Sequence, residues 1–486
     1  MTAYEKVLEN YLKFPDRSDF VPIKSGTEGN VSVLYSGSTG LAKARFLTFY
    51  LGVDAELVSS EKEKIFEILE TLGGDVSGED YGSDDEVFED GEGNILSASY
   101  DDAPIIKLVN QLMIQAVKNG ASDIHFEGKD NSFAVRFRVD GKLSTIRQFP
   151  KKMQDSVIAR IKVISSLDVA ETRKPQDGRI NMKIGNRTID VRVSTVPSVT
   201  GEKAVLRILE RSKSMATLEK VGMAGRNLDV YRAALKRPNG IILVTGPTGS
   251  GKTTTLYASL LELVSDDTNI VTIEDPVEYQ MEKITQVQVN PAVNITFANA
   301  IRSFLRQDPD IILVGEIRDE ETAQAAVQAS LTGHLVLSTL HTNDAPTAVA
   351  RLIDMNVEPF LISSSLLCTM GQRLVRKICP HCKTEVESDD YVKNYFAAEG
   401  FDLPKHYMGK GCEQCFNTGY KGRTGIFEIM TVNDPIRKMI NDRASSSELM
   451  HEAKNHGYQR MFDYGYELVQ AGTTTPWELI AVTRID

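Results

Sequence analysis

The 486-residue sequence lacks any apolar stretch that approaches the roughly 18 to 20 residues of a membrane-spanning helix. The first residues do not predict a secretory signal, because Glu5 and Glu9 interrupt any basic and apolar pattern there. Positive charge is not in excess, since the net charge is −12. These absences argue against a membrane span and against nucleic acid as a partner. We expect a protein that is cytosolic or is held at a membrane by partner proteins.

The negative charge is concentrated in one part of the chain. Residues 65–106 hold thirteen Asp and Glu and no Lys or Arg, so the remainder is close to neutral. Residues 74–100 have too few apolar side chains to offset the entropy lost on ordering. We predict a flexible acidic linker there, with an acidic interaction segment as the alternative. A short N-terminal domain, 1–73, precedes it, and its residues 54–72 have a helical pattern.

Residues 101–210 change from a helical to a strand-like pattern. Apolar residues recur at helical spacing over 104–118 and alternate over 123–126, 133–139 and 189–193. This predicts a small α+β domain. Arginines on or beside its strands can be held rigidly toward an anion, although such residues often only solvate a strand face. They are Arg136, Arg138, Arg179, Arg192 and Arg207.

A phosphate-binding motif opens the last domain, 235–486, after an expected interdomain linker at 211–234. The P-loop, Gly246–Thr253, reads Gly-Pro-Thr-Gly-Ser-Gly-Lys-Thr between a strand pattern and a helix pattern. Glycines let backbone N–H groups turn toward phosphate, and the next helix points its positive end there. An ordinary glycine-rich turn is the alternative. The residues predicted to bind ATP are Gly246, Pro247, Thr248, Gly249, Ser250, Gly251, Lys252, Thr253 and Thr254.

Strand patterns alternate with helix patterns through this domain, which predicts a parallel sheet with ligands at its strand ends. The strands are 241–245, 270–273, 311–314 and 335–340. The Glu274–Glu278 loop follows the second strand, Glu316 follows the third, and His334 and His341 bracket the fourth. Such groups suit Mg²⁺ binding and activation of an attacking water. The ordinary alternatives are helix-capping acids and a histidine bonded to a carbonyl.

Four of the five cysteines form two Cys-X-X-Cys pairs separated by 29 residues: Cys379 with Cys382, and Cys412 with Cys415. Four thiolates at this spacing suit a closed tetrahedral Zn²⁺ site. Disulfides are the alternative, but a reducing cytosol disfavours them. Cys368 lies in an apolar run and is expected to be an inert core thiol.

From about residue 101 onward, the chain resembles the secretion ATPases of type II secretion and type IV pilus assembly. The matching segments are 120–125, 174–179, the P-loop, 274–278, 308–319 and 333–344. The four cysteines and the segment 419–428 resemble the assembly and export branch of that family. Rival interpretations are a nucleic-acid-translocating or competence-type motor on the same fold, and a nucleotide-binding scaffold without turnover.

The resemblance implies a homohexameric ATPase that extends a pilus or pseudopilus, with an inner-membrane platform protein and cytoplasmic domains of the machinery as partners. Each subunit would pack a PAS-like N2 domain, 101–210, on a RecA-like α/β domain. The latter would carry a zinc-binding insert at about 372–425 and end in helices. ATP would bind between the two domains, with Mg²⁺.

The resemblance also implies roles for individual residues. Glu316 would serve the metal, Glu278 would position or deprotonate water, and His341 would sense the γ-phosphate. Arg192 and Arg207 would be arginine fingers, for which we consider action across a subunit boundary. Whether Glu274 replaces Glu278 as the base stays open.

Overall fold

The computed structural model describes residues 104–184, 187–210 and 216–483, with scattered positions between 7 and 68. The chain divides into two compact units, Met1–Asp85 and Glu86–Asp486. Within the described ranges, no helix is both long and apolar enough to cross a bilayer. The predicted acidic linker at 74–100 lies outside the described residues.

The first unit contains a three-stranded sheet. β1 (Phe20–Ser25) pairs antiparallel with β2 (Asn30–Tyr35), which pairs parallel with β3 (Ala55–Ser59). The helix expected over 54–72 is therefore wrong for Ala55–Ser59. Leu57 and Val58 pack against the core of this sheet, so pairing with β2 outweighs the helical spacing of the apolar residues.

The second unit begins with a six-stranded antiparallel sheet in the order β6-β5-β4-β9-β8-β7. Its elements are α4 (Pro104–Lys118), β4 (Ala121–Gly128), β5 (Ser132–Val139), β6 (Lys142–Pro150), α5 (Gln154–Ile164), β7 (Gln176–Ile184), β8 (Arg187–Val196) and β9 (Lys203–Glu210). The core combines Leu112 of α4 and Ile161 of α5 with apolar residues such as Phe126 of β4. Two helices thus bury the apolar face of one sheet, as the change of period predicted.

The ATPase domain is built on a seven-stranded sheet in the order β12-β11-β13-β14-β10-β15-β18. The strands are β10 (Gly240–Thr245), β11 (Ile270–Glu274), β12 (Ile284–Gln288), β13 (Ile311–Val314), β14 (Leu335–Leu340), β15 (Leu366–Ile378) and β18 (Tyr420–Thr431). All pairs are parallel except β15 with β18. Every residue of β10, β13 and β14 is buried, because both faces of a parallel sheet carry helices.

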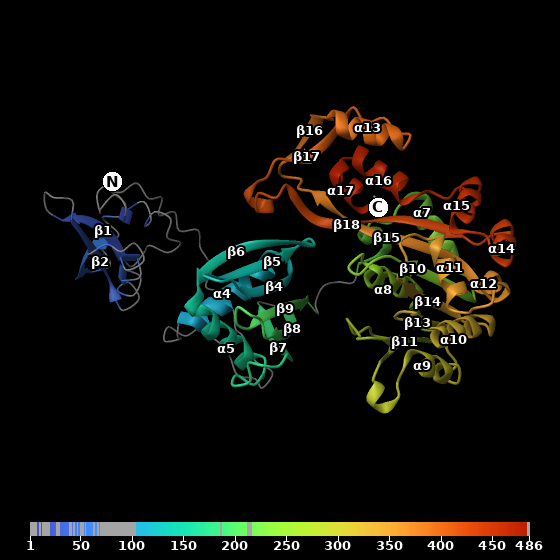
Figure 1. Cartoon of the computed structure of the whole chain (residues 1–486), viewed down its shortest axis with the longest axis horizontal. Coiled ribbons are helices and arrows are strands. Elements are labelled where there is room, and N and C mark those ends of the chain that lie inside the picture. The colour runs from blue at the N-terminus through green and yellow to red at the C-terminus, as the bar shows by residue number, and fades with distance from the viewer. Residues whose placement is uncertain are drawn as a thin grey trace. The chain divides into compact units, whose positions relative to one another are not determined.

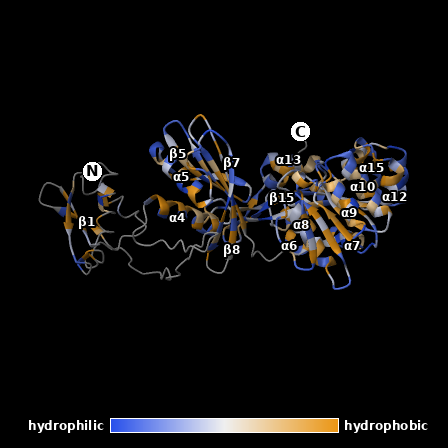
Figure 2. Ribbon diagram, turned by 90° about the horizontal axis from the view of Figure 1, so that it is seen from below, coloured by the Kyte–Doolittle hydropathy of each residue, from blue (hydrophilic) through white to orange (hydrophobic). Residues whose placement is uncertain are grey.

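Alternate residues of β10 enter two different cores, which identifies the two faces of the sheet. Ile242 and Val244 pack in one cluster, and Ile241 and Leu243 in the other. The first face carries α6 (Leu218–Val221), α7 (Gly225–Leu235), α8 (Lys252–Leu263), α16 (Met461–Gln470) and α17 (Pro476–Thr483). The second face carries α9 (Phe297–Phe304), α10 (Glu320–Leu331), α11 (Thr347–Asp354), α12 (Pro359–Ser365), α14 (Asp434–Asn441) and α15 (Ser446–Asn455). In Figure 2 these helices are orange in part and blue elsewhere, as amphipathic helices are.

The predicted interdomain linker at 211–234 differs from the structure. Residues 211–215 lie outside the described ranges, but Leu218 and Tyr231 are fully buried in the ATPase core. α6 and α7 each have an apolar face that is buried against the sheet, whereas a linker would have no such face. The ATPase fold therefore begins before residue 235.

The insert is reached through a long hairpin. β15 and β18 pair from Cys368 opposite Thr431 to Ile378 opposite Tyr420. Figure 1 shows these two strands leading from the sheet to β16 (Lys383–Glu387), α13 (Asp390–Ala398) and β17 (Lys405–Gly409). Of the expected insert at 372–425, the two ends thus belong to the hairpin strands.

Candidate active site and metal centre

The P-loop connects β10 to α8 and turns through three glycines with positive φ. Gly246, Gly249 and Gly251 have φ of 147°, 79° and 90°, which side-chain-bearing residues rarely adopt. α8 begins at Lys252, so the positive end of the helix lies at the loop. This is the geometry of a phosphate-binding site.

Lys252 is turned onto its own loop. Its Nζ donates to the carbonyl oxygens of Gly246 at 2.7 Å and Pro247 at 3.1 Å. Burial lowers the pKa of Lys252, an effect that the charge of Glu316 partly opposes. A buried ammonium held only by neutral carbonyls is a strong attractor for a phosphate group.

A hollow of about 410 Å³ lies over the P-loop. It brings together the predicted residues Thr248 to Thr254 with Glu278, Glu316 and His341. The carboxyl ends of three parallel strands place those three side chains there. Gly246 and Pro247 connect to the same site through the bonds from Lys252.

Glu316 and His341 face each other across two neighbouring strands. His341 Nε2 lies 3.3 Å from Glu316 Oε2, and Arg318 makes a close ion pair with the same carboxylate. His334 stands at the opposite end of β14, where its Nδ1 lies 2.8 Å from the carbonyl oxygen of Ala329. The ordinary interpretation, a histidine bonded to backbone, therefore fits His334.

Glu274 and Glu278 differ sharply in their surroundings. Glu274 is 4% exposed and accepts hydrogen bonds from Thr272 Oγ1, Gln286 Nε2 and, closely, Tyr257. The side chain of Glu278 is 34% exposed, and its Oε2 accepts no hydrogen bond within the described chain. Glu278 is thus the less enclosed of the two carboxylates, and it keeps an oxygen that accepts no hydrogen bond within the described residues.

The two predicted fingers are placed differently. Arg192 on β8 lies 3.6 Å from Glu278 Oε2 of the same chain. Arg207 on β9 donates from Nε to Asp123 Oδ1 at 3.1 Å, and neither arginine lines the P-loop hollow. Since one chain already brings Arg192 to Glu278, no subunit boundary is needed for that approach.

Other residues in the hollow had no predicted role. Tyr257, Phe297, Leu374 and Arg423 also line it. Arg423 lies in the segment 419–428, whose family resemblance was the only signal available. Its position comes from the pairing of β18 with β15, which no local pattern reveals.

The four predicted zinc ligands converge at the end of the hairpin. Their sulfur atoms all lie within 4.8 Å of one another. Separations of 3.8, 3.8 and 3.7 Å join Cys379 to Cys412, Cys382 to Cys415, and Cys412 to Cys415. A tetrahedral site with Zn–S of about 2.3 Å implies sulfur separations of about 3.8 Å, whereas a disulfide requires about 2.05 Å.

The cysteines of the cluster do not share one electrostatic environment. Burial opposes ionisation of Cys415, but backbone N–H groups of Cys412 and Gly419 lower its pKa to about 6. Burial raises the pKa of Cys382 to about 11 and also raises the pKa of Cys412. A thiolate is the form that binds zinc. By contrast, Cys368 is fully buried in the core and burial raises its pKa to about 12, as expected of an inert thiol.

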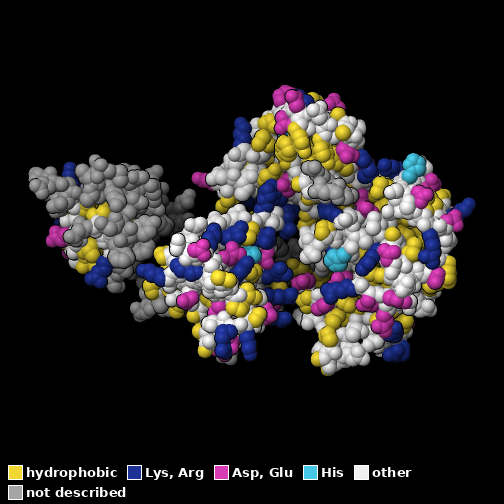
Figure 3. All heavy atoms as spheres, in the orientation of Figure 1, with side chains coloured by type: hydrophobic (Ala, Val, Ile, Leu, Met, Phe, Trp, Pro, Cys, Tyr) yellow, Lys and Arg dark blue, Asp and Glu magenta, His cyan; other side chains and the backbone are white. Residues whose placement is uncertain are grey.

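The insert packs an exposed aromatic side chain on a C-terminal helix. Tyr391 of α13 stacks on Trp477 of α17, with ring centroids 5.4 Å apart and an interplanar angle of 8°. Both are about half exposed. Figure 3 shows hydrophobic side chains gathered at the surface over the insert and the adjacent C-terminal helices.

The fold and the P-loop hollow together define a P-loop nucleotide-hydrolysing protein with a RecA-like parallel sheet. Residues 98–482 match a family described as type II/IV secretion system protein. The chain is 49% identical over 411 residues to the type II secretion system ATPase E of Vibrio cholerae, covering 84% of this chain and 82% of that protein. It is 43% identical over 453 residues to the type IV pilus assembly ATPase PilB of Myxococcus xanthus, covering 90% and 80%.

A solved structure agrees with the fold. The pilus retraction motor PilT with bound ADP superposes with a TM-score of 0.52 and 26% identity, covering 77% of this chain and 96% of that one. The predicted fold class is confirmed. This chain belongs to the type II/IV secretion system protein family, and it is an ATPase of that family.

Proposed function

We propose that this chain is the motor that uses ATP hydrolysis to assemble a type IV pilus or a type II secretion pseudopilus. The observation that carries the proposal is the convergence of the P-loop, Glu278, Glu316 and His341 on one hollow. One relative is named as a type II secretion ATPase and another as a pilus assembly ATPase, and these names support both machineries as candidates.

In this proposal, the P-loop N–H groups and Lys252 bind the phosphates. Thr253 and Glu316 would hold Mg²⁺, which neutralises phosphate charge. Glu278 positions or deprotonates the attacking water, and His341 faces the γ-phosphate. Catalysis then consists of positioning and electrostatic stabilisation, as in other phosphoryl-transfer enzymes.

Arg192 and Arg207 act as arginine fingers from the N2 domain. The contact of Arg192 with Glu278 at 3.6 Å supports action within one chain, because a short movement transfers the guanidinium from the carboxylate to a terminal phosphate. The subunits form a homohexamer on the cytoplasmic side of the inner membrane, and a platform protein and cytoplasmic domains of the machinery transmit the motion. The sulfur separations support Zn²⁺ as a structural ion held by Cys379, Cys382, Cys412 and Cys415.

The hydrolytic role is tested by Glu278→Gln and its matched control Glu274→Gln. We expect Glu278→Gln to bind ATP with unchanged affinity and to lose turnover, because only the carboxylate that engages water is removed. Steady-state phosphate release and fluorescent-nucleotide binding measure the two quantities. Normal turnover in Glu278→Gln together with loss in Glu274→Gln would assign the base to Glu274.

Mixed rings test where the fingers act. Chains with Arg192→Ala are mixed with chains with Glu278→Gln, and ring formation is checked by mass photometry. Action within a chain predicts no recovery of hydrolysis, since no chain then holds both residues. Recovery of part of the parental activity would show action across the subunit boundary.

A further inference from the structure

Three arginines stand side by side on one face of the N2 sheet. Arg179 on β7 is in register with Arg192 on β8, which is in register with Arg207 on β9. Directly opposite residues of antiparallel strands point to the same face. All three line one hollow of about 450 Å³, together with Asp177. We call these three residues the arginine row.

The members of the row differ in their ion pairs. Arg207 is paired with Asp123, which also lies 3.6 Å from Arg138. Arg192 faces Glu278. Arg179, in contrast, has no ion pair or hydrogen bond from its side chain within the described part of the chain. Asp177 and Asp190 line hollows together with Arg179, but neither forms an ion pair with it among the described residues, so its guanidinium remains available to an anion.

Such an arrangement is unfavourable without a ligand. Like charges directly opposite each other destabilise an antiparallel pair, and Arg179 and Arg192 form one such pair. Arg179 is exposed, so packing does not require it. An anion in the hollow would offset the repulsion between the arginines. The planar guanidinium group matches phosphate oxygens in particular.

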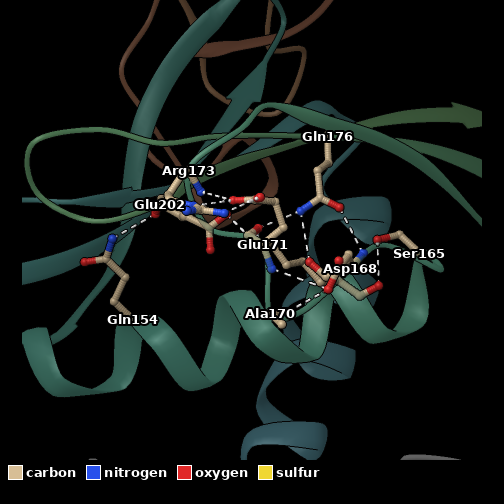
Figure 4. A network of polar contacts seen from close by, with 9 residues as sticks. Gln154, Ser165, Asp168, Ala170, Glu171, Arg173, Gln176 and Glu202 are labelled. Atoms are coloured by element: carbon tan, nitrogen blue, oxygen red, sulfur yellow. Dashed lines mark hydrogen bonds and ion pairs between the residues drawn. The ribbon is translucent and has the colours of Figure 1, made fainter.

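The strand that carries Arg179 is fixed at its start. Gln176 Nε2 donates to the carbonyl oxygens of Asp168 and Glu171 at 2.9 and 2.8 Å, and its Oε1 accepts from the Asp168 N–H at 2.9 Å. Figure 4 shows these contacts converging on the loop before β7. Gly178 passes so close to this loop that an added Cβ would lie 2.5 Å from the Ser165 carbonyl oxygen. Arg179 therefore projects from a rigid support.

The row adjoins the nucleotide site. A further hollow of about 410 Å³ is lined by Arg179, Asp190 and Arg192 from the N2 sheet, and by residues that include Glu278 and Tyr279 from the ATPase domain. Glu278 also lines the hollow over the P-loop. One carboxylate thus stands between the arginine row and the position expected for the terminal phosphate.

We propose that Arg179 is a third phosphate-binding arginine, which meets the terminal phosphate of a nucleoside triphosphate together with Arg192 and Arg207. The proposal rests on the proposed function, in which the latter two are fingers. The diphosphate lacks the group that Arg179 binds. Arg179 therefore gives the nucleotide site a means to distinguish ATP from ADP.

The test compares Arg179→Ala, Arg179→Lys and the matched control Lys183→Ala. Lys183 lies on the same exposed face of β7 but outside the hollow. Affinities for a non-hydrolysable ATP analogue and for ADP are measured by calorimetry. We expect Arg179→Ala to reduce the affinity for the analogue by about ten- to a hundredfold, which corresponds to loss of charged hydrogen bonds. The affinity for ADP should stay unchanged. Arg179→Lys should be intermediate, and Lys183→Ala should change neither affinity.

Three results would overturn the proposal: unchanged analogue affinity in Arg179→Ala, equal weakening of analogue and ADP, or the same effect in Lys183→Ala. Arg192→Ala is measured in parallel to separate this proposal from the proposed function. If Arg192→Ala loses turnover while Arg179→Ala behaves like the parent, only the role of Arg179 fails. If both variants behave like the parent, the arginine fingers fail as well.

Discussion

The chain presents two surfaces to phosphate that are built in different ways. The P-loop offers backbone N–H groups, a helix N-terminus and one buried lysine. The arginine row offers side chains on three exposed or half-exposed strand positions. The first is contiguous in sequence, whereas the second joins residues 13 and 15 positions apart through strand register.

This difference separates the binding of a nucleotide from the discrimination between ATP and ADP. Backbone groups of the P-loop cannot move far, so they suit the phosphates that ATP and ADP share. Guanidinium groups on another domain can approach or withdraw with that domain, so they suit the phosphate that is gained and lost in each cycle. A motor needs both, because hydrolysis must change how tightly the domains associate.

The largest effect is expected at the P-loop. Lys252→Ala should reduce affinity for both ATP and ADP, and turnover should fall on the order of 10³-fold, because a preorganised charge on the phosphates is removed. Lys236→Ala, an exposed lysine at the end of α7, is the matched control. Fluorescent-nucleotide titration measures both affinities. Retained ADP binding in Lys252→Ala would show that the P-loop lysine does not provide the binding shared by ATP and ADP.

The next effect is expected at Arg192. Arg192→Ala should keep ADP affinity and lose about 10³-fold or more in turnover, as arginine fingers do. Arg173→Ala is the control, since Arg173 is 84% exposed and paired with Glu171 on the same domain. Single-turnover phosphate release gives the rate. If ADP affinity fell as strongly as turnover, the N2 surface would contribute to binding in general rather than to discrimination.

Sequence reasoning succeeded where short, contiguous signals were strong. The strands predicted at 241–245, 311–314 and 335–340 are confirmed, because each begins with at least three consecutive apolar residues. It failed at Ala55–Ser59, where pairing with β2 decides the structure, and at α6 and α7, whose burial depends on distant strands. The distinction between Arg179 and Arg192 was equally out of reach, since partners are set by register and tertiary contact.

A smaller effect concerns the loop that carries His341. The buried Glu428 accepts hydrogen bonds from the N–H groups of Ala345 at 2.8 Å and Met461 at 3.1 Å. Glu428→Gln presents one N–H donor with an amide NH₂, which costs about 1 to 3 kcal/mol of stability. Thermal melting should show a lower Tm, and the KM for ATP should change less than kcat, because His341 rather than the P-loop is displaced.

The stability difference between the parent and Glu428→Gln depends on pH, because burial raises the pKa of Glu428 in the parent above 4.5. Between 4.5 and the raised value, the unfolded chain binds fewer protons than the folded one, so stability falls as pH rises through that window. Glutamine does not titrate. The stability advantage of the parent over Glu428→Gln should therefore be larger at pH 5 than at pH 7, and the opposite trend would contradict a raised pKa.

The smallest effect on nucleotide affinity is expected from the zinc site of the insert. Side chains form this site, as they form the arginine row, but it does not face phosphate. We expect about one Zn²⁺ per chain in the parent and less in Cys382→Ser, because three thiolates leave the tetrahedral shell incomplete. Cys368→Ala, at a cysteine outside the cluster, should keep the metal. Elemental analysis of the purified proteins decides this, and four freely titrating thiols in the native parent would contradict the site.

ADP affinity of Cys382→Ser should stay within about twofold of the parent, because loss of zinc unfolds the tip of the insert and not its base. Arg423, which lines the P-loop hollow, is held opposite Arg376 by the pairing of β15 with β18. That ladder continues to Cys368 opposite Thr431, well inside the sheet. A large loss of ADP affinity in Cys382→Ser, with the parental Tm of the ATPase domain retained, would mean that the insert sets the geometry of the hollow and that phosphate binding depends on a third region.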